Sequence, residues 1–534
     1  MLLTCSYSME EIERPISIYW FREAWIKIAM HRLKHLSFAI VNFWIITMKT
    51  VKKLAFLLLS ICQLSSAQTP SNEVRKFLKF EAPVIALTHA RIIDGNGGAT
   101  QLDRTIILRG DKIEAIGDSK LVIPSDAKII DVSGHTVIPG LVGMHNHLMY
   151  TASTHTDEDE KLPPPGFLVT ELAFSAPRLY LASGVTTMRT AGSIEPYTDM
   201  NIKRLIDTLK MPGPHIDVTA PYLEGKESIY PQMLWLNNAE HARQSVAFWA
   251  GQGMTSFKAY VNISEAELGA AIKEAHKHGL KLTGHLCSVD YRQAANLGID
   301  NLEHGPVFTD SEFVPNRKPD TCPSGRDIAA SWEKLEISGP EVQGLISHLV
   351  SKKVTITSTL PVFESFVATR PLLSKRQAEL MSAESLRSHL HARSSAATNP
   401  QGAAAREAAL KKEMAFELAF VKAGGLLIAG PDPTGNGGVL PGFGDQRGIQ
   451  LLVEAGFSAA EAIQIASANG AKYMGMLHQF GTVEAGKRAD LVVVKGDPSQ
   501  RIKDIENVEM VIKDGRAYDP MKLINSVKGM VGIR

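Results

Sequence analysis

Two patterns of apolar and polar positions follow one another along the chain. Residues 83–137 carry short apolar runs bounded by Gly and Asp, such as 90–94, which is followed by the turn cluster 95–98. Runs of this kind are typical of antiparallel strands. From Pro139 onward, apolar runs of strand type alternate with stretches of helical period. The chain is therefore predicted to begin its fold in antiparallel strands and to continue in alternating strands and helices.

The alternating region contains eight predicted strands. They cover 141–147, 184–190, 215–223, 255–261, 281–286, 301–305, 354–360 and 425–432. The helices predicted between them cover 168–183, 264–278, 288–297, 340–352 and 403–423, and Gly279 and Gly424 stand where two of these helices should end. Eight strand–helix units over about 330 residues fit a (β/α)8 barrel with insertions. Residues 306–340 and 364–402 are expected to be long loops over the mouth of the barrel.

The end of the chain returns to the first pattern. After a helical stretch at 459–473, residues 480–517 again read as strands and turns, for example 489–494. The predicted fold class is α/β: a (β/α)8 TIM-type barrel with a small β-sandwich domain built from both ends of the mature chain. The expected boundaries are 83–138 and 474–519 for the two parts of the β-sandwich, 139–473 for the barrel, and 520–534 for a C-terminal tail.

Residues 48–67 have the three parts of a secretory signal peptide. A basic start with three lysines is followed by the mostly apolar stretch 54–64 and by small residues that end at Ala67. A short buried helix is the alternative. Residues 1–47 are interpreted as an upstream extension outside the fold, because nothing should precede a signal peptide. The protein is expected to be exported, to the periplasm or the medium, after cleavage near Ala67.

Composition excludes several classes of protein. The chain has 534 residues, of which 44% are hydrophobic and 21% charged, and a formal net charge of +1. This is ordinary globular composition, and the near-zero charge gives no reason to expect nucleic acid as a partner. No apolar run reaches the roughly 18 residues of a transmembrane span. Outside the leader, Cys287 and Cys322 could pair in an oxidising compartment or remain thiols.

Metal-ligand residue types recur where the predicted barrel strands end. They are His145 and His147 on the first strand, Lys258 inside the fourth, and His285, His304 and Asp432 at the ends of the fifth, sixth and eighth. Residues two apart in a strand face the same way, so both first-strand imidazoles should point into the barrel. Barrels of this type keep their active sites at this end. The alternative is that each is a core polar group with its own hydrogen-bond partner.

With these residues in place, the chain resembles the amidohydrolase superfamily, in the branch of imidazolonepropionase-like and prolidase-type hydrolases. The resemblance covers nearly all of 83–519 and is carried by the runs 90–94, 139–147, 184–187, 303–305 and 486–491. It implies that His145, His147 and Asp432 hold one divalent metal ion, with Zn²⁺ as the preferred ion, and that His285 and His304 hold a second. It also implies that carbon dioxide carboxylates Lys258, because a carbamate offers two anionic oxygens that can bridge two cations. Asp432 would then take a proton from the attacking water and pass it to the leaving amine.

The resemblance implies a metal-dependent amidohydrolase that cleaves an amide-type carbon–nitrogen bond in a small-molecule or dipeptide-like substrate. A lactonase or phosphotriesterase on the same binuclear site is one alternative, and a catalytically inactive binding protein on the same fold is another. A homo-oligomer is possible. Prolidase-type members often carry a tyrosine two residues after the fifth-strand histidine, where this chain has Cys287. Tyr260 is the candidate replacement, and an ordinary packed tyrosine is the alternative.

Two further departures concern the substrate rather than the metals. Arg189 is followed by Thr190 where such members often have Arg-Asp, and Gln446, Arg447 and Gly448 stand near the family's His and Glu.

Overall fold

The structure is a computed structural model, and it describes residues 69–153, 167–226, 228, 230–370, 373–433 and 438–532. The chain divides into two units, Met1–Thr69 and Pro70–Arg534. The predicted extension at 1–47 and the predicted signal peptide at 48–67 lie outside the described residues.

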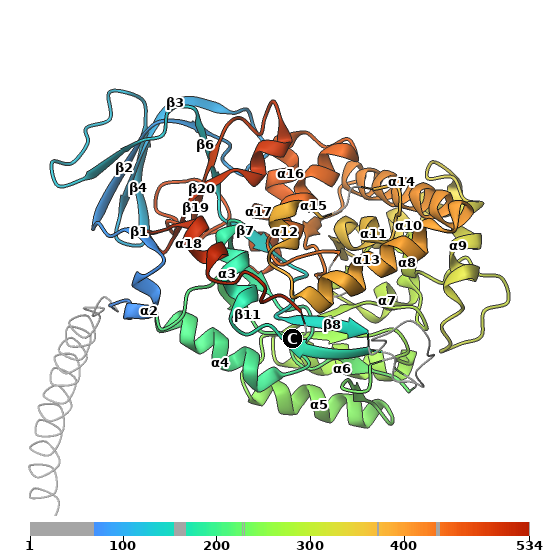
Figure 1. Ribbon diagram of the computed structural model, residues 1–534. Coiled ribbons are helices and arrows are strands. Elements are labelled where there is room, and N and C mark those ends of the chain that lie inside the picture. Colours follow the sequence, from blue (N-terminus) through green and yellow to red (C-terminus); the bar gives the residue numbers. More distant parts are fainter. Residues whose placement is uncertain are drawn as a thin grey trace, which may run out of the picture. The chain divides into compact units, whose positions relative to one another are not determined.

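Strands from both ends of the second unit form one nine-stranded sheet, drawn in blue and red in Figure 1. Its strands are β1 (Leu78–Phe80), β2 (Val84–Ile92), β3 (Gln101–Arg109), β4 (Lys112–Gly117), β5 (Lys128–Asp131), β6 (His135–Pro139), β19 (Leu491–Lys495), β20 (Val508–Lys513) and β21 (Arg516–Tyr518). The order is β1-β21-β20-β19-β6-β2-β3-β4, and β5 pairs with β2. The junction between the two ends is the antiparallel pair β19–β6, in which Leu491 lies opposite Pro139. The two ends therefore meet as predicted, whereas the two-layered sandwich stays a prediction.

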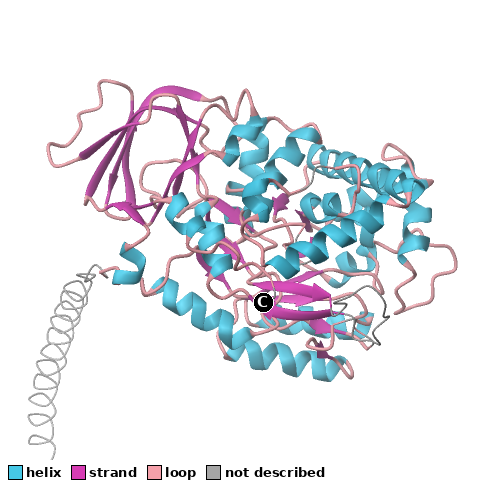
Figure 2. Cartoon of the chain, in the orientation of Figure 1, coloured by secondary structure: helices cyan, strands magenta, loops and turns pink. Residues whose placement is uncertain are grey.

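The alternating region forms parallel strands covered by helices (Figure 2). One sheet has the order β11-β10-β7 and the other β13-β12-β14-β15-β16-β17-β18. Their bounds are β7 (Leu141–Gly143), β10 (Val185–Arg189), β11 (His215–Asp217), β12 (Leu223–Glu224), β13 (Leu234–Trp235), β14 (Ser256–Ala259), β15 (Lys281–Gly284), β16 (Asn301–Glu303), β17 (Thr355–Ser358) and β18 (Leu427–Ala429). All eight predicted strands are present in shorter form, and the mixed α/β class is confirmed.

Backbone hydrogen bonds link these two parallel sheets in two places, between β7 and β18 and between the segments next to β11 and β14. Met144 N donates to Ala429 O (2.8 Å), and Thr255 N donates to Val218 O (3.1 Å). These bonds are isolated, and in the described part of the chain the strand ladders stay two sheets. A closed eight-stranded barrel therefore remains a prediction.

Helices follow most of the parallel strands, and further helices lie before β1 and after β21. They are α2 (Asn72–Arg75), α3 (Ser175–Ala182), α4 (Pro196–Asp207), α5 (Ala239–Gly251), α6 (Glu265–Lys277), α7 (Tyr291–Leu297), α8 (Pro306–Thr309), α9 (Gly325–Glu333), α10 (Pro340–Ser351), α11 (Leu360–Ser365), α12 (Lys375–Ala378), α13 (Ala383–Ala397), α14 (Pro400–Lys422), α15 (Phe443–Glu454), α16 (Ala459–Ile465), α17 (Ala468–Tyr473), the 3-10 helix η1 (Ile502–Glu506) and α18 (Pro520–Asn525). Gly279 and Gly424 have φ of 68° and 93°, the left-handed conformation expected just past a helix.

Three expectations were wrong in part. Residues 168–171, predicted to begin a helix, belong to β9 (Phe167–Glu171), which pairs with β8 (Met149–Ser153) as an antiparallel hairpin. The insertions 306–340 and 364–402, expected as loops, contain helices: α8 and α9 in the first, α12 and α13 in the second. The reason is that α8 and α12 have four residues each and α13 is weakly amphipathic, so the sequence gives these three no clear 3.6-residue period.

The first insertion is tied to the end of β15. Cys287 and Cys322 form a disulfide, with their Cα atoms 5.0 Å apart, which decides between the two states that the sequence left open. None of the described helices is both long and apolar enough to cross a membrane.

Candidate active site

The end of β7 and the end of β18 bring three predicted ligands together. His145 and His147 follow β7, and their Nε2 atoms lie 3.5 and 3.2 Å from Asp432 Oδ1. The backbones also touch, because Asp432 N donates to His145 O (3.0 Å). Gly430 permits this approach, since a Cβ there would collide with the backbone of His145.

The two histidines of β15 and β16 face each other beside this group. His285 Nδ1 lies 2.9 Å from His304 Nε2, and His304 Nε2 lies 3.9 Å from Asp432 Oδ2. The other ring nitrogen of His304, Nδ1, lies 2.6 Å from the hydroxyl of Thr359, which accounts for the orientation of the ring. Asp432 therefore stands between one pair of imidazoles and the other, with one oxygen toward each.

Two of these residues have unusual backbone conformations. His304 and Asp432 have φ of 66° and 52°, in the left-handed region that side chains other than glycine seldom adopt. Strain of this kind, of order 1–3 kcal/mol per residue, tends to persist where the surrounding structure holds a functional side chain in place. Here it turns both side chains toward the same point at the strand ends.

Burial keeps the imidazoles neutral. Burial, followed by the nearby charge of Lys258, lowers the pKa of His145 to about 4 and that of His285 to about 3. Burial and the neighbouring His285 also hold the pKa of His304 well below 6.5. Neutral imidazoles present lone pairs rather than protons, and nitrogen and carboxylate ligands suit Zn²⁺. The set is therefore chemically fit to bind metal.

Lys258 lies in β14, buried at the same centre. Its side chain is 1% exposed, and its Nζ lies 4.0 Å from Glu303 Oε1. Burial lowers its pKa to about 8, although Glu303 and Asp432 act in the opposite direction. A lysine with this pKa is partly unprotonated at neutral pH, and only the neutral amine can react with carbon dioxide.

A family comparison decides the identity of this arrangement. The family model described as "Amidohydrolase family" matches residues 136–313 and 379–518, which is more than half of the chain. The chain belongs to the amidohydrolase family. This confirms the predicted family and the predicted class of enzyme, a hydrolase acting on carbon–nitrogen bonds.

Several known proteins are similar to this amidohydrolase. N-substituted formamide deformylase from Arthrobacter pascens is 31% identical over 84 residues, a match that spans 15% of each chain. A Xaa-Pro dipeptidase with bound methionine has a TM-score of 0.59 at 20% identity, covering 82% of this chain and 100% of that one. Bottromycin amidohydrolase has a TM-score of 0.63 at 18% identity (85% and 91% covered), and ochratoxinase of A. niger 0.57 at 16% (84% and 100% covered). At these identities the structural likeness concerns the fold.

Several residues support the site in a role that the sequence did not predict. Arg189 and Glu303 are 1% and 0% exposed and form an ion pair of 2.6 Å beneath His145. Asn146, between the two first-strand histidines, donates from Nδ2 to Asp445 Oδ1 on α15 (3.0 Å). The position of Glu303 could have indicated its role. It directly precedes His304, and an acidic residue inside a buried strand needs a partner.

Tyr260 lies beside the predicted ligands. Its ring centroid is 4.9 Å from that of His285 and 5.1 Å from that of Tyr222. The ring of Tyr222 lies in turn 6.5 Å from that of His147. Tyr260 thus belongs to an aromatic wall along the site, a position that allows contact with a substrate.

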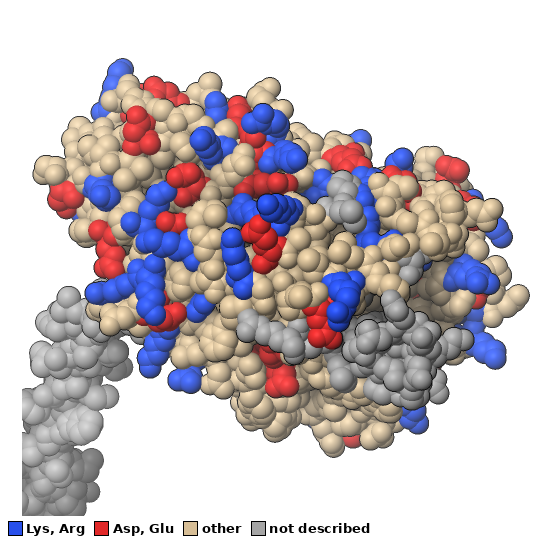
Figure 3. All heavy atoms as spheres, viewed as in Figure 1, with Lys and Arg blue, Asp and Glu red and all other residues tan. Residues whose placement is uncertain are grey.

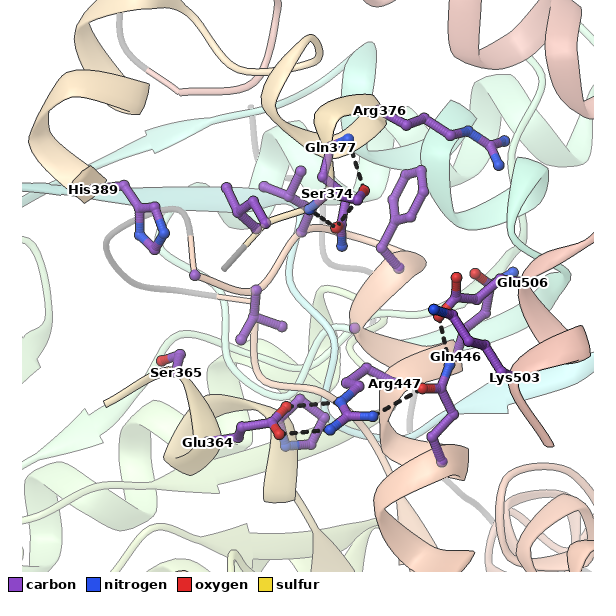
Figure 4. Close-up of a pocket in the computed structure, with 18 of the residues that line it drawn as sticks. Glu364, Ser365, Ser374, Arg376, Gln377, His389, Gln446, Arg447, Lys503 and Glu506 are labelled. Atoms are coloured by element: carbon purple, nitrogen blue, oxygen red, sulfur yellow. Dashed lines mark hydrogen bonds and ion pairs between the residues drawn. The ribbon is translucent and has the colours of Figure 1, made fainter. Parts of the chain in front are cut away.

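Two of the residues on α15 that differ from the family's His and Glu, Gln446 and Arg447, make contacts within the fold. Gln446 Nε2 donates to Ser183 O (3.0 Å), and the Arg447 guanidinium binds both oxygens of Glu364 on α11 (2.6 and 2.8 Å). This pair lines a cavity of about 330 Å³ between α11, α12, α13, α15 and η1 (Figure 4). Across α11 from that cavity, Phe363 packs its ring 5.5 Å from His304.

The surface carries both signs of charge. On the face drawn in Figure 3, Lys and Arg side chains are interspersed with Asp and Glu. This agrees with the formal net charge of +1.

Proposed function

We propose that this amidohydrolase is a binuclear metal-dependent enzyme that cleaves an amide-type carbon–nitrogen bond in a small-molecule or dipeptide-like substrate. The observation that carries the proposal is the convergence of imidazole nitrogens from His145, His147, His285 and His304 around Asp432. The names of the similar proteins, a formamide deformylase and a Xaa-Pro dipeptidase, support cleavage next to nitrogen.

In this proposal, His145, His147 and Asp432 hold one divalent ion, and His285 and His304 hold the other. Lys258, carboxylated by carbon dioxide, bridges the two. Zn²⁺ is the preferred ion for this ligand set. The ions, when bound, would lower the pKa of a shared water and polarise the scissile carbonyl.

Asp432 is proposed to move the proton. Burial would raise the pKa of its carboxyl, but the neighbouring imidazoles, His145 foremost, hold that pKa well below its usual value. The carboxylate is therefore ionised and can accept a proton from the attacking water. It lies between the two imidazole pairs, where it can return the proton to the leaving amine. Tyr260, in the aromatic wall, is proposed to contact the substrate carbonyl.

The finer features of the fold belong to the same proposal. The hydrogen bonds from Met144 and Thr255 support closure of the two parallel sheets into one (β/α)8 barrel at 139–473. The strands of 83–138 and 474–519 would form a β-sandwich beside it, and 520–534 a tail. Export after cleavage near Ala67 is supported by the Cys287–Cys322 disulfide, since such bonds persist in oxidising compartments.

The test combines metal content with a substrate screen. Protein loaded with Zn²⁺ in the presence of bicarbonate should hold about two ions per chain and hydrolyse N-acyl amino acids or dipeptides. Lys258→Ala should lose most activity and at least one ion, and acetate or propionate should restore part of both by replacing the bridge. Activity confined to lactones or phosphotriesters would contradict the proposed substrate class. Full activity and two ions in Lys258→Ala would refute the bridge.

A further inference from the structure

A buried polar network lies directly beneath His145. It joins Arg189 of β10, Thr283 of β15, and Asn301 and Glu303 of β16. Glu303 is 0% exposed, so its carboxylate is stabilised only by protein groups. The network sits on the opposite side of His145 from Asp432, because the two residues contact different ring nitrogens.

The two oxygens of Glu303 have different partners. Oε1 accepts from Arg189 Nη2 (2.6 Å) and from the Thr283 hydroxyl (2.6 Å). Oε2 lies 2.8 Å from His145 Nδ1. Arg189 is itself fixed, since its Nε donates to Met144 O (2.7 Å) and its Nη2 also reaches Asn301 Oδ1 (2.9 Å). The oxygen that faces His145 is therefore held in place by the other end of the same carboxylate.

An ionised carboxylate can only accept hydrogen bonds. The ion pair with Arg189 keeps Glu303 ionised, so His145 must donate from Nδ1. Its Nε2 then carries a lone pair and faces Asp432. The other first-strand histidine lacks this support, because His147 Nδ1 has no hydrogen-bond partner among the described residues.

We propose that Glu303 is a positioning residue of the metal centre: held by Arg189, it fixes His145 as the Nδ1–H tautomer and directs Nε2 into the site. This rests on the proposed function and extends it to a residue that would not touch metal or substrate. Outer carboxylates of this kind raise the basicity of a ligating imidazole, and their loss typically costs 10–100-fold in metal affinity.

Glu303→Gln gives a sharp test. The glutamine oxygen should stay with Arg189, because a guanidinium can only donate hydrogen bonds. Its amide NH₂ should then face His145 Nδ1. His145 would be forced into the opposite tautomer, with Nε2–H pointing into the site. Thr283→Val is the matched control, because it removes a hydrogen bond from the same carboxylate and leaves the contacts to Arg189 and His145.

Two measurements test the proposed role of Glu303. In the metal-free wild type, ¹⁵N NMR of labelled histidine, assigned with His145→Gln, should show Nδ1–H at His145, and Glu303→Gln should show Nε2–H. Competition with a chelating dye should give Zn²⁺ or Co²⁺ affinity 10–100-fold lower in Glu303→Gln and near wild type in Thr283→Val, with a changed Co²⁺ visible spectrum only in the former.

An Nε2–H tautomer in the wild type would overturn the proposal, and this result does not depend on whether Glu303→Gln folds. Wild-type affinity in a folded Glu303→Gln would overturn it equally. A wild type that binds no divalent ion would instead refute the binuclear hydrolase, while the tautomer measurement would still report on Glu303.

Discussion

At the scale of the residue, the site depends on burial, which lowers the pKa values of its histidines and its lysine. The imidazoles of His145 and His285 are neutral because burial lowers their pKa to about 4 and about 3. The ammonium of Lys258 is destabilised by the same burial. The two imidazoles are thereby in the neutral state that metal binding requires, and a fraction of Lys258 is a neutral amine at neutral pH.

Loading of the binuclear site should depend on the protonation state of Lys258. Its pKa of about 8 means that the neutral amine, which alone reacts with carbon dioxide, becomes abundant as pH rises through 8. At constant dissolved carbon dioxide, the initial rate of reconstitution with Zn²⁺ should be roughly 25-fold higher at pH 8.5 than at pH 6.5. Activity recovered from metal-free protein measures this rate, and ¹³C NMR of labelled carbamate verifies its cause. A rate independent of pH would contradict carbamate formation as the slow step.

Asp432→Asn should separate binding from catalysis. Asparagine keeps one oxygen acceptor but cannot take a proton, while His145 and His147 still offer their nitrogens. The kcat on an amide should fall by roughly 10²–10⁴, and the kcat on an ester of the same acyl group should fall less, because an alkoxide needs less help in leaving. Elemental analysis must show equal metal content in the two proteins. An unchanged amide rate in a metal-replete variant would remove Asp432 from proton transfer.

At the scale of the element, strand ends could be predicted from the sequence, but contacts between elements could not. The positions of His145, His285, His304 and Asp432 follow from apolar runs that stop at a polar residue. The Arg189–Glu303 pair joins residues 114 positions apart, and no local pattern encodes such a partnership. The hairpin β8–β9 was missed for a related reason, since its strands pair across a long connection.

The disulfide should stabilise the first insertion and the end of β15. Cys287 and Cys322 are 35 residues apart, and closing a loop of that length stabilises the fold by about 3–4 kcal/mol through the unfolded chain. Cys287→Ala/Cys322→Ala should therefore melt at lower temperature, as should the wild type after reduction. Calorimetry with and without reductant measures both shifts. The double variant also serves as the control for the reductant, because it lacks this disulfide. If the reductant lowers the melting temperature of the double variant too, its effect does not come from the Cys287–Cys322 bond.

At the scale of the whole molecule, the fold was predictable to the level of its class. Eight alternating units predicted the parallel strands, and the two β-rich ends predicted a small β-sandwich domain built from both ends. The pairing of β19 with β6 shows that the two ends share one sheet, while the sandwich stays a prediction. Short helices such as α12 were not predictable, because four residues with none of them buried carry no repeating apolar face. The aromatic wall with Tyr260 likewise needed the folded chain, since Tyr222 lies directly before β12 and Tyr260 directly after β14.

Acid should destabilise the metal-free protein through its buried histidines. Their folded-state pKa values, about 4 for His145 and about 3 for His285, lie below the 6.5 of an exposed histidine. Between pH 6.5 and about 4 the unfolded chain therefore binds protons that the folded chain excludes, so stability falls as pH falls through this window. Above pH 6.5 these two groups are neutral in both the folded and the unfolded state, so they do not make the free energy of unfolding depend on pH.

Buried carboxyl groups change the pH dependence of stability in the opposite direction. Burial raises the pKa of Glu413 to about 8 and that of Asp199 to about 7, so their contribution to stability falls as pH rises from about 4 through those values. His145→Asn/His285→Asn retains these carboxyls and lacks both histidines, which isolates the acid effect. Calorimetry of the two metal-free proteins from pH 4 to 8 should show a steeper acid loss of melting temperature in the wild type. Zn²⁺ should flatten the wild-type curve, because a coordinated imidazole cannot take a proton until the ion leaves. Parallel curves for the two metal-free proteins would mean that other groups govern acid unfolding.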